Sequence, residues 1–456
     1  MASAVDEARE AGRRARSDTP RRALAEVAER PSDYDPVDRI LWQGEGRVAA
    51  LLPFRYRRMG VSEFAFLRGA ALIMTDDLAR GPATPLEVQI GGDAHAANFG
   101  VFSSPERRPI FDLNDFDETD CGPFEWDVKR LVTSLVVVAA QRGDDNAVLT
   151  ALAEDTASSY QRSLAVFAAA PRLDVWYAAL DVETGLSELR GFFTDTAARA
   201  VDDVIRRAKS KEPRTFSHLV DVVDGHPTIR PDPPHVTSLN DASNGALLTR
   251  DDLERVLAGY VTTLASERQV LATQFTFVDG ARLVRGVGSV GTQCFAVLLT
   301  GRDDSDLLFL QIKEAQRSVI SIARGTDESL DPGERVVTGQ RLMQATPDAL
   351  LGWHSISVGG SSCSFYVRQL YDQRASVALD RLSATQLRAY ARACAWVLAR
   401  AHARSGLSAE ISGYVGEGRQ FARSVGAFAL AYRERNAKDF RAFTKAVAQG
   451  RIPAAT

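Results

Sequence analysis

The sequence predicts an α+β fold in which a unit of antiparallel strands, roughly residues 275–370, lies between two mostly helical regions. Residues Phe275–Ile312 alternate apolar and polar side chains around an Asp279-Gly280 turn, a pattern typical of paired strands. Residues His354–Leu370 predict two more strands around a glycine pair. On either side, apolar residues recur at three- and four-residue spacing, which is the helical period.

The other elements follow in chain order. Ser62–Arg80 is predicted to be a helix that Ser62 caps and that a Gly-Pro pair ends. Short strands are expected at Leu86–Ile90 and Pro109–Leu113, before a buried helix at Trp126–Gln141. A loop rich in Pro, Asp and Ser follows at Pro213–Asn244. Further helices are expected at Asp145–Lys211, Leu247–Thr273, Ser383–Arg404 and Gly418–Ala448, and one opens at the capping-box pattern Asp331-Pro332-x-Glu334.

Composition limits the class of protein. The 456 residues carry a net charge of −4, which argues against non-specific nucleic-acid binding, because phosphate backbones select a basic surface. The four cysteines show no CxxC spacing, so we expect free thiols in a reducing compartment. No run of about 18 apolar residues occurs and the N-terminal segment has no apolar signal region. We therefore expect a cytoplasmic protein without a membrane partner.

The first chemical motif joins Asp93 to Asn98, five residues later, on a tight loop after a predicted strand. The Asp carboxylate can accept or orient the proton of an attacking hydroxyl, and the Asn side chain can ligate a Mg²⁺ that bridges phosphates. An Asx-rich loop that only caps itself is the alternative. His95 between them is a further candidate, and hydrogen bonding to the loop backbone is its expected role.

The second motif places four acidic residues within seven positions, at Asp112, Asp115, Asp117 and Glu118. Like charges this close repel one another unless a cation lies among them, and Mg²⁺ prefers one or two carboxylates with phosphate oxygens and water. A solvated acidic turn is the alternative. The pattern favours a metal site, because the segment follows a strand and is interleaved with Phe and Leu.

The third motif is a glycine loop, Gly286, Gly288 and Gly291, that a strand follows. A dinucleotide site requires a helix at the last glycine, whereas a glycine loop between strands is typical of kinases, where backbone N–H groups cover ATP phosphates. A hairpin without function is the alternative. Lys313 ends the apolar strand that follows the glycine hairpin, and it matches the kinase lysine that pairs with phosphates. Glu334 is its candidate carboxylate partner, and it fits a helix cap equally well.

The first two motifs together resemble the catalytic half of aminoglycoside-phosphotransferase-like kinases. The resemblance implies that Asp93 is the catalytic base and that Asn98 and Asp115 hold Mg²⁺. We also expect Asp117 to help with a second metal. The resemblance also implies that Asp127 anchors the helix after this loop.

Two later segments add to the resemblance. Tyr366–Tyr371 is similar to the edge strand and hinge that contact adenine, through the backbone of Gln369 and Leu370. Leu398–Ala403 is similar to the end of the helix that immediately precedes the catalytic loop in that family.

The chain order of these motifs is swapped relative to ordinary kinases, since the catalytic loop comes before the glycine loop. Catalysis needs proximity in space and not a particular order. The resemblance therefore implies a circularly permuted, protein-kinase-like two-lobed fold, with a small antiparallel-sheet lobe and a larger helical lobe. We expect four parts: an N-terminal tail at 1–35, the catalytic and metal-binding lobe with a helical insert at 36–245, a linking helix and nucleotide-binding lobe at 246–375, and C-terminal helices at 376–456 that return to the helical lobe.

Most of the chain also resembles the bacterial domain-of-unknown-function family 2252. The resemblance rests on the segments Leu52–Met59, Phe64–Gly69, Gly92–Gly100, Phe111–Thr119, Gly339–Gln344 and Leu351–Trp353. That family implies no reaction of its own.

We therefore expect an ATP- and Mg²⁺-dependent phosphotransferase that acts on an unknown small-molecule or protein acceptor. Arg68 is a candidate substrate contact, because it places one charge on an apolar helix. A nucleotide-binding regulatory module with weak catalysis or an AMP transferase is one alternative. A metal-dependent phosphohydrolase, suggested by the Asp-x-His spacing at His95, is another.

Overall fold

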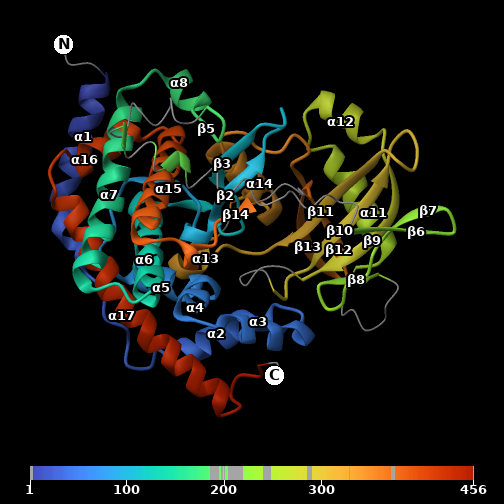
Figure 1. The fold of residues 1–456 in the computed structure, drawn as a ribbon, viewed down its shortest axis with the longest axis horizontal. Coiled ribbons are helices and arrows are strands. Elements are labelled where there is room, and N and C mark those ends of the chain that lie inside the picture. Colours follow the sequence, from blue (N-terminus) through green and yellow to red (C-terminus); the bar gives the residue numbers. More distant parts are fainter. Residues whose placement is uncertain are drawn as a thin grey trace.

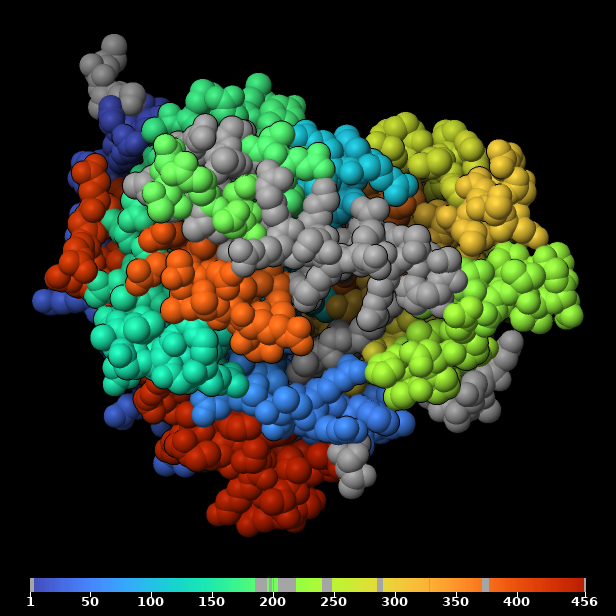
Figure 2. All heavy atoms as spheres, in the orientation of Figure 1, coloured from blue at the N-terminus to red at the C-terminus, as the bar shows by residue number. Residues whose placement is uncertain are grey.

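The computed structural model describes residues 4–184, 195–196, 199, 201–203, 219–239, 248–284, 290–327, 329–370 and 375–454. Helices gather on one side of the molecule and a six-stranded sheet lies on the other (Figure 1; Figure 2 shows all heavy atoms in the same orientation). The mixed α+β composition that the sequence predicts is confirmed.

The helical side is built around one apolar core that includes Leu135, Tyr390 and Trp396. Its long helices are α6 (Phe124–Gln141), α7 (Asn146–Ala169), α15 (Ala384–Arg404) and α17 (Gln420–Ala448). α7 packs against both α15 and α17, and α17 also packs against α6. Helix α6 is buried over nearly its whole length, as expected for its apolar sequence.

The N-terminal segment differs from the expected tail. Helix α1 (Ala4–Asp18) packs on α16 (Ser408–Val415). A Cβ on Gly12 would lie 1.8 Å from the Glu410 carbonyl oxygen, and one on Gly413 would lie 2.1 Å from the Arg9 carbonyl oxygen. The two glycines therefore allow the helix backbones to approach closely, and this contact holds the segment in place.

The six-stranded sheet is antiparallel, with the order β12-β13-β11-β10-β9-β8. Its strands are β8 (Val236–Ser238), β9 (Thr276–Leu283), β10 (Cys294–Thr300), β11 (Leu307–Ala315), β12 (Gly352–Val358) and β13 (Ser361–Gln369). Helix α11 (Arg250–Val261) packs against β12, β13 and β9. The adjacent α12 (Ser266–Ala272) shares the expected Leu247–Thr273 segment with it.

The predicted Asp279-Gly280 turn is wrong, because both residues lie inside β9. The pairing with β10 shifts register between Leu298 and Leu299, and this irregularity lets the strand continue. The Asp279 carboxylate accepts a hydrogen bond from the backbone N–H of Ile229, at 2.8 Å. Its side chain therefore joins a neighbouring strand and does not close a turn.

Smaller elements carry the loops of the site. β1 (Glu87–Ile90) pairs with β4 (Asp120–Pro123), and the second sheet has the order β14-β2-β3-β5. Its strands are β2 (Phe99–Ser103), β3 (Pro109–Leu113), β5 (Leu180–Asp181) and β14 (Ala375–Ser376). The Asp93 loop connects β1 to β2, and the acidic segment connects β3 to β4. Both loops therefore leave neighbouring strands of the same region.

The helix predicted at Ser62–Arg80 is two helices, α4 (Glu63–Gly69) and α5 (Ala71–Arg80), which meet at the non-helical Ala70 (φ −115°, ψ 37°). The Ser62 cap is confirmed, since its side chain accepts from the Ala65 N–H. The remaining helices are α2 (Pro36–Glu45), α3 (Leu52–Met59), α8 (Arg172–Tyr177), α13 (Val319–Arg324) and α14 (Pro332–Met343).

The expected Pro213–Asn244 loop contains, in its described part, the hairpin β6 (Val220–Val223) with β7 (His226–Ile229) and the strand β8. Much of the Asp145–Lys211 segment beyond β5 lies outside the described residues. Within the described ranges, no helix combines the length and apolar character that crossing a bilayer requires.

Candidate functional site

Asp127 on α6 anchors the backbone of the loop that carries Asp93. The buried Asp127 carboxylate accepts the backbone N–H groups of Gly91 and Gly92, at 2.7 and 3.0 Å. Gly92 has φ +74°, and a Cβ there would lie 2.1 Å from the Glu118 carbonyl oxygen. Only glycine fits this turn, which brings the Asp93 loop directly beside the acidic segment.

Helix α15 lies against the same loop although it is far away in sequence. His402 Nε2 lies 3.3 Å from the Asp127 carboxylate, and the Tyr160 hydroxyl contacts His402 Nδ1 at 2.8 Å. The Tyr390 hydroxyl donates to the carbonyl oxygens of Ala96 and Phe99, at 2.7 and 3.0 Å. The helix segment that the resemblance placed just before the catalytic loop is thus its spatial neighbour.

Asp93 forms a buried ion pair with Arg130 of α6. Arg130 Nε and Nη2 both approach Asp93 Oδ1, at 2.8 and 2.7 Å. Burial raises the pKa of Asp93 to about 6, although the Arg130 charge opposes this shift. Arg130 was not among the residues predicted for the site, although a charge in the middle of an apolar helix indicates an acidic partner.

The His95 ring lies between the Asp93 carboxylate and the Phe64 ring, and a hydrogen bond with the His95 backbone also acts on it. Its Nε2 lies 3.7 Å from Asp93 Oδ2, and its ring packs edge-on against Phe64 with centroids 6.2 Å apart. Burial, together with the charges of Arg68 and Arg130, lowers the pKa of His95 well below its usual value. His95 is therefore neutral where its ring lies between Asp93 and the apolar side chain of Phe64.

Asn98 and Asp115 offer oxygen donors at neighbouring positions. The Asn98 Nδ2 group donates to the Asp93 carbonyl oxygen at 2.7 Å, which leaves the amide oxygen as the free acceptor. The Asn114 N–H donates to the Asn98 carbonyl oxygen at 2.9 Å and so ties the two loops together. The Asp115 side chain remains 40% exposed. These donors suit Mg²⁺, which takes few protein oxygens and completes its shell with phosphate and water.

A metal held by protein groups alone is a poorer fit. Among the described residues, no group of three or more His, Cys, Asp and Glu side chains is placed to chelate an ion.

Lys313 extends from the end of β11 into the acidic segment. Its ammonium lies 3.9 Å from Asp115 and forms a close ion pair with Asp117. The second Asp117 oxygen accepts the Tyr366 hydroxyl at 2.8 Å. Burial alone would lower the pKa of Lys313, but the two carboxylates hold it well above its usual value. Lys313 is charged, and the two predicted half-sites meet here.

Glu334 is not the partner of Lys313. The carboxylates beside the ammonium come from Asp115 and Asp117, and Asp331 caps helix α14 by accepting the Gly333 N–H at 2.9 Å. The neighbouring Arg335 instead joins α14 to the acidic segment, since its guanidinium donates to the Asp117 carbonyl oxygen at 3.0 Å. Arg335 thus ties α14 to the backbone of the segment whose carboxylates contact Lys313.

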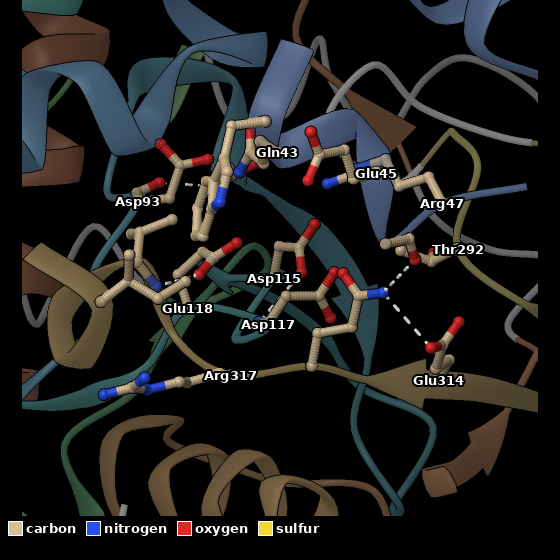
Figure 3. Close-up of a pocket in the computed structure, with 16 residues that line it drawn as sticks. Gln43, Glu45, Arg47, Asp93, Asp115, Asp117, Glu118, Thr292, Glu314 and Arg317 are labelled. Carbon is tan, nitrogen blue, oxygen red and sulfur yellow. Dashed lines mark hydrogen bonds between the residues drawn. The ribbon is translucent and has the colours of Figure 1, made fainter. Parts of the chain in front are cut away.

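A cavity of about 310 Å³ opens between these groups. In Figure 3 the four carboxylates of the two acidic loops lie between residues of the N-terminal segment and residues that follow Lys313. The labelled lining residues are Gln43, Glu45, Arg47, Asp93, Asp115, Asp117, Glu118, Thr292, Glu314 and Arg317. No sequence motif had indicated that the segment 43–47 would line this cavity.

Glu118 is an additional acidic group in this cavity. Burial raises the pKa of Glu118 to about 7, although the Val319 N–H, which donates to its carboxylate at 2.7 Å, favours the charged form. The side chain therefore changes its protonation state near neutral pH.

The glycine loop is described only at its end. Gly286 and Gly288 lie outside the described residues. Gly291 has φ +95°, and its carbonyl oxygen accepts the Val48 N–H at 2.7 Å. The Arg47 guanidinium donates to the Val290 carbonyl oxygen at 2.8 Å. The N-terminal segment thus holds the end of this loop at the cavity wall.

The expected adenine-binding hinge uses its backbone donors internally. The Gln369 N–H donates to the Asp348 carboxylate, and the Leu370 N–H donates to the Phe309 carbonyl oxygen at 3.0 Å. The preceding strand β13 lies between β11 and β12, so it is not the expected edge strand. These two N–H groups are therefore not available to a nucleobase in this arrangement.

Arg68 lies on α4, on the other side of the Asp93 loop. Its guanidinium carbon lies 5.9 Å from the centre of the Phe64 ring. Burial lowers the pKa of Arg68, while the charges of Asp93 and Asp115 oppose the shift. Arg68 is therefore close enough to the site to interact with it electrostatically.

Comparisons with known proteins identify a family and no function. No curated protein and no solved structure matches the chain. A family model described as "Uncharacterized protein conserved in bacteria (DUF2252)" matches residues 47–446, which is most of the sequence. The chain belongs to this bacterial family.

Proposed function

We propose that the protein is an ATP- and Mg²⁺-dependent phosphotransferase with a circularly permuted, protein-kinase-like arrangement of its site. The supporting observation is that Lys313 pairs with Asp117 and lies 3.9 Å from Asp115, and that both carboxylates line the cavity. A lysine that can bind phosphates and a carboxylate that can hold Mg²⁺ come from segments almost 200 residues apart. Asp93 and Asn98 line the same cavity.

Each group has a role in this proposal. Lys313 pairs with the nucleotide phosphates and is held charged by its acidic neighbours. Asn98 and Asp115 supply oxygen ligands for Mg²⁺, which when bound neutralises the phosphate charge. Asp93 orients the acceptor hydroxyl and takes its proton, and the raised pKa of its carboxyl suits proton transfer near neutral pH.

The position of the end of the glycine loop, next to the cavity, supports phosphate binding by this loop. Thr292, which follows Gly291, and Arg47, which precedes Val48, line the cavity, and the Val48 N–H donates to the Gly291 carbonyl oxygen between these segments. Adenine could contact the backbone of Gln369 and Leu370 only if their internal hydrogen bonds opened. We therefore propose that adenine binds in the part of the cavity lined by Trp42 and Thr292.

Thermal unfolding with and without Mg²⁺-ATP tests nucleotide binding. A ligand at ~100 times its Kd stabilises the folded state by roughly 2.7 kcal/mol. Lys313→Met and Asp115→Asn should lose this stabilisation, whereas Asp155→Asn, in an ion pair on the far helix α7, should keep it. If both site variants fold and still show the wild-type shift, the assignment is wrong.

Product analysis separates the proposal from its alternatives. Slow ATP consumption that yields ADP, and that falls by about 10²- to 10⁴-fold in Asp93→Asn, supports phosphotransfer. Release of pyrophosphate indicates an AMP transferase, and binding without turnover indicates a regulatory module. Phosphate release from model esters without nucleotide indicates a hydrolase.

A further inference from the structure

A second cavity, of about 500 Å³, lies on the other side of the Asp93 loop. Ala97, within the loop, forms part of its wall, while Asp93 and Asn98 line the first cavity. The remaining walls come from α4, the end of α6 and the segment that leads to α15: Ser62, Phe64, Ala65, Arg68, Val138, Gln141, Arg142, Val377, Ala378, Leu379 and Asp380. Residues of the Asp93 loop therefore line both cavities, and Arg68 in the second is close enough to Asp93 to interact with it electrostatically.

Arg68 is the notable polar group in this second cavity. None of the described residues gives its guanidinium a hydrogen-bond or ion-pair partner, and its Nε is buried. Arg68 is partly buried, and a buried guanidinium N–H without a hydrogen-bond acceptor is costly, because the lost hydration is not replaced. The neighbouring Arg142 differs, since it is paired with Asp144 and with the Leu382 carbonyl oxygen. Arg68 thus has unused donors for an anion.

The rest of the cavity is largely apolar. Phe64 lies between Arg68 and the His95 ring, and Val138, Val377 and Leu379 form further walls. A ligand that fills such a site has an apolar body and an anionic group that reaches Arg68.

We propose that this cavity is the acceptor site, and that the acceptor is a hydroxyl compound with an apolar body and a carboxylate or phosphate group that pairs with Arg68. The chemical step rests on the proposed function. The acceptor oxygen would bond to the γ-phosphorus of ATP, the bond from that phosphorus to the ADP oxygen would break, and the hydroxyl proton would pass to Asp93. Binding in the cavity does not depend on this step.

Binding of small hydroxy acids to the full chain tests the site. The probes are 6-hydroxyhexanoate and 3-(4-hydroxyphenyl)propanoate, and 1,6-hexanediol is the uncharged control. Their binding is measured by calorimetry without nucleotide. We expect at least one acid to bind and the diol not to bind. Arg68→Leu should lower the binding affinity for the acid by about tenfold or more, which corresponds to the loss of one charge-assisted hydrogen bond. Arg58→Leu on α3 should leave the affinity unchanged.

A second variant guards against loss of folding in Arg68→Leu. Ala378→Trp fills the cavity from a loop position and should also abolish acid binding while leaving the Mg²⁺-ATP stabilisation intact. With both acids and Mg²⁺-ATP present, the phosphorylated acid should appear by mass spectrometry in the wild type.

The two proposals fail separately. If Mg²⁺-ATP binds in a Lys313-dependent manner but neither acid binds, or if binding survives both cavity variants, the acceptor-site inference is overturned and the phosphotransferase proposal stands. If an acid binds through Arg68 but Mg²⁺-ATP does not bind, the phosphotransferase proposal fails and the anion-binding cavity remains.

Discussion

Lys313 and Asp117, which are 196 positions apart, form a close ion pair at the boundary between the six-stranded sheet and the helical part of the molecule. The Lys313 side chain is only 5% exposed, and the Tyr366 hydroxyl holds the other oxygen of the same carboxylate. Burial would raise the pKa of Asp117, but the Lys313 charge lowers it. The pair therefore links two segments of the chain, and it lies beside the more exposed Asp115.

The two aspartates should differ in their effect on stability. Asp117→Asn leaves the buried Lys313 charge without its main partner, and we expect a loss of about 3 kcal/mol. Asp115→Asn removes a carboxylate that is 40% exposed and 3.9 Å away, and it should cost about 0–1 kcal/mol. Urea unfolding of both variants measures the difference. Equal losses would show that the ion pair is not the main contact of Lys313.

Arg130 should set the working pH of Asp93. Its charge opposes the effect of burial, so Arg130→Gln should move the pKa of Asp93 further above 6. The acid limb of the pH dependence of ATP turnover should therefore move to higher pH. Arg392→Gln, which breaks an ion pair with Asp155 between α15 and α7, is the matched control and should leave the profile unchanged. An unchanged profile in Arg130→Gln would remove Asp93 from the titrating step.

Glu118 should make stability fall as pH rises. Its pKa is about 7 in the folded protein and 4.5 in the reference state, so the folded protein holds a proton that the unfolded chain has lost between these values. The contribution of Glu118 is thus present below about pH 4.5 and is lost as pH rises through 7. Glu118→Gln should be more stable relative to wild type at pH 8 than at pH 5, as measured by chemical unfolding. The opposite trend would contradict the burial of this group.

Gly291 should be needed for more than its backbone conformation. Gly291 and Gly359 both have positive φ values, so an alanine costs about 1 kcal/mol at either position. Gly359 faces open space, whereas a Cβ on Gly291 would lie 3.0 Å from the Arg47 side chain. Gly291→Ala should therefore weaken Mg²⁺-ATP binding, and Gly359→Ala should not. Calorimetric titration of both variants compares the two directly, and equal affinities would argue against a role for the Arg47 contact.

Local patterns predicted much of the framework. Apolar patterns located the strands β10 to β13, the helical segment that begins at the Ser62 cap, and helix α15, because these signals arise from residues near one another in sequence. Local chemistry also predicted where Asp93, Asn98 and Asp115 lie on loops after strands. These features follow from backbone geometry and side-chain periodicity, which a single segment contains.

The tertiary structure alone decided which distant groups meet. The choice of Asp117 over Glu334 as the partner of Lys313, the Arg130 ion pair, and the use of the Gln369 N–H by Asp348 all depend on through-space packing. A buried charge takes the nearest opposite charge that the packing supplies, whatever its position in the chain. The sequence by itself determined that Asp93, Asn98 and Asp115 lie on loops after strands, and the folded chain determined their partners.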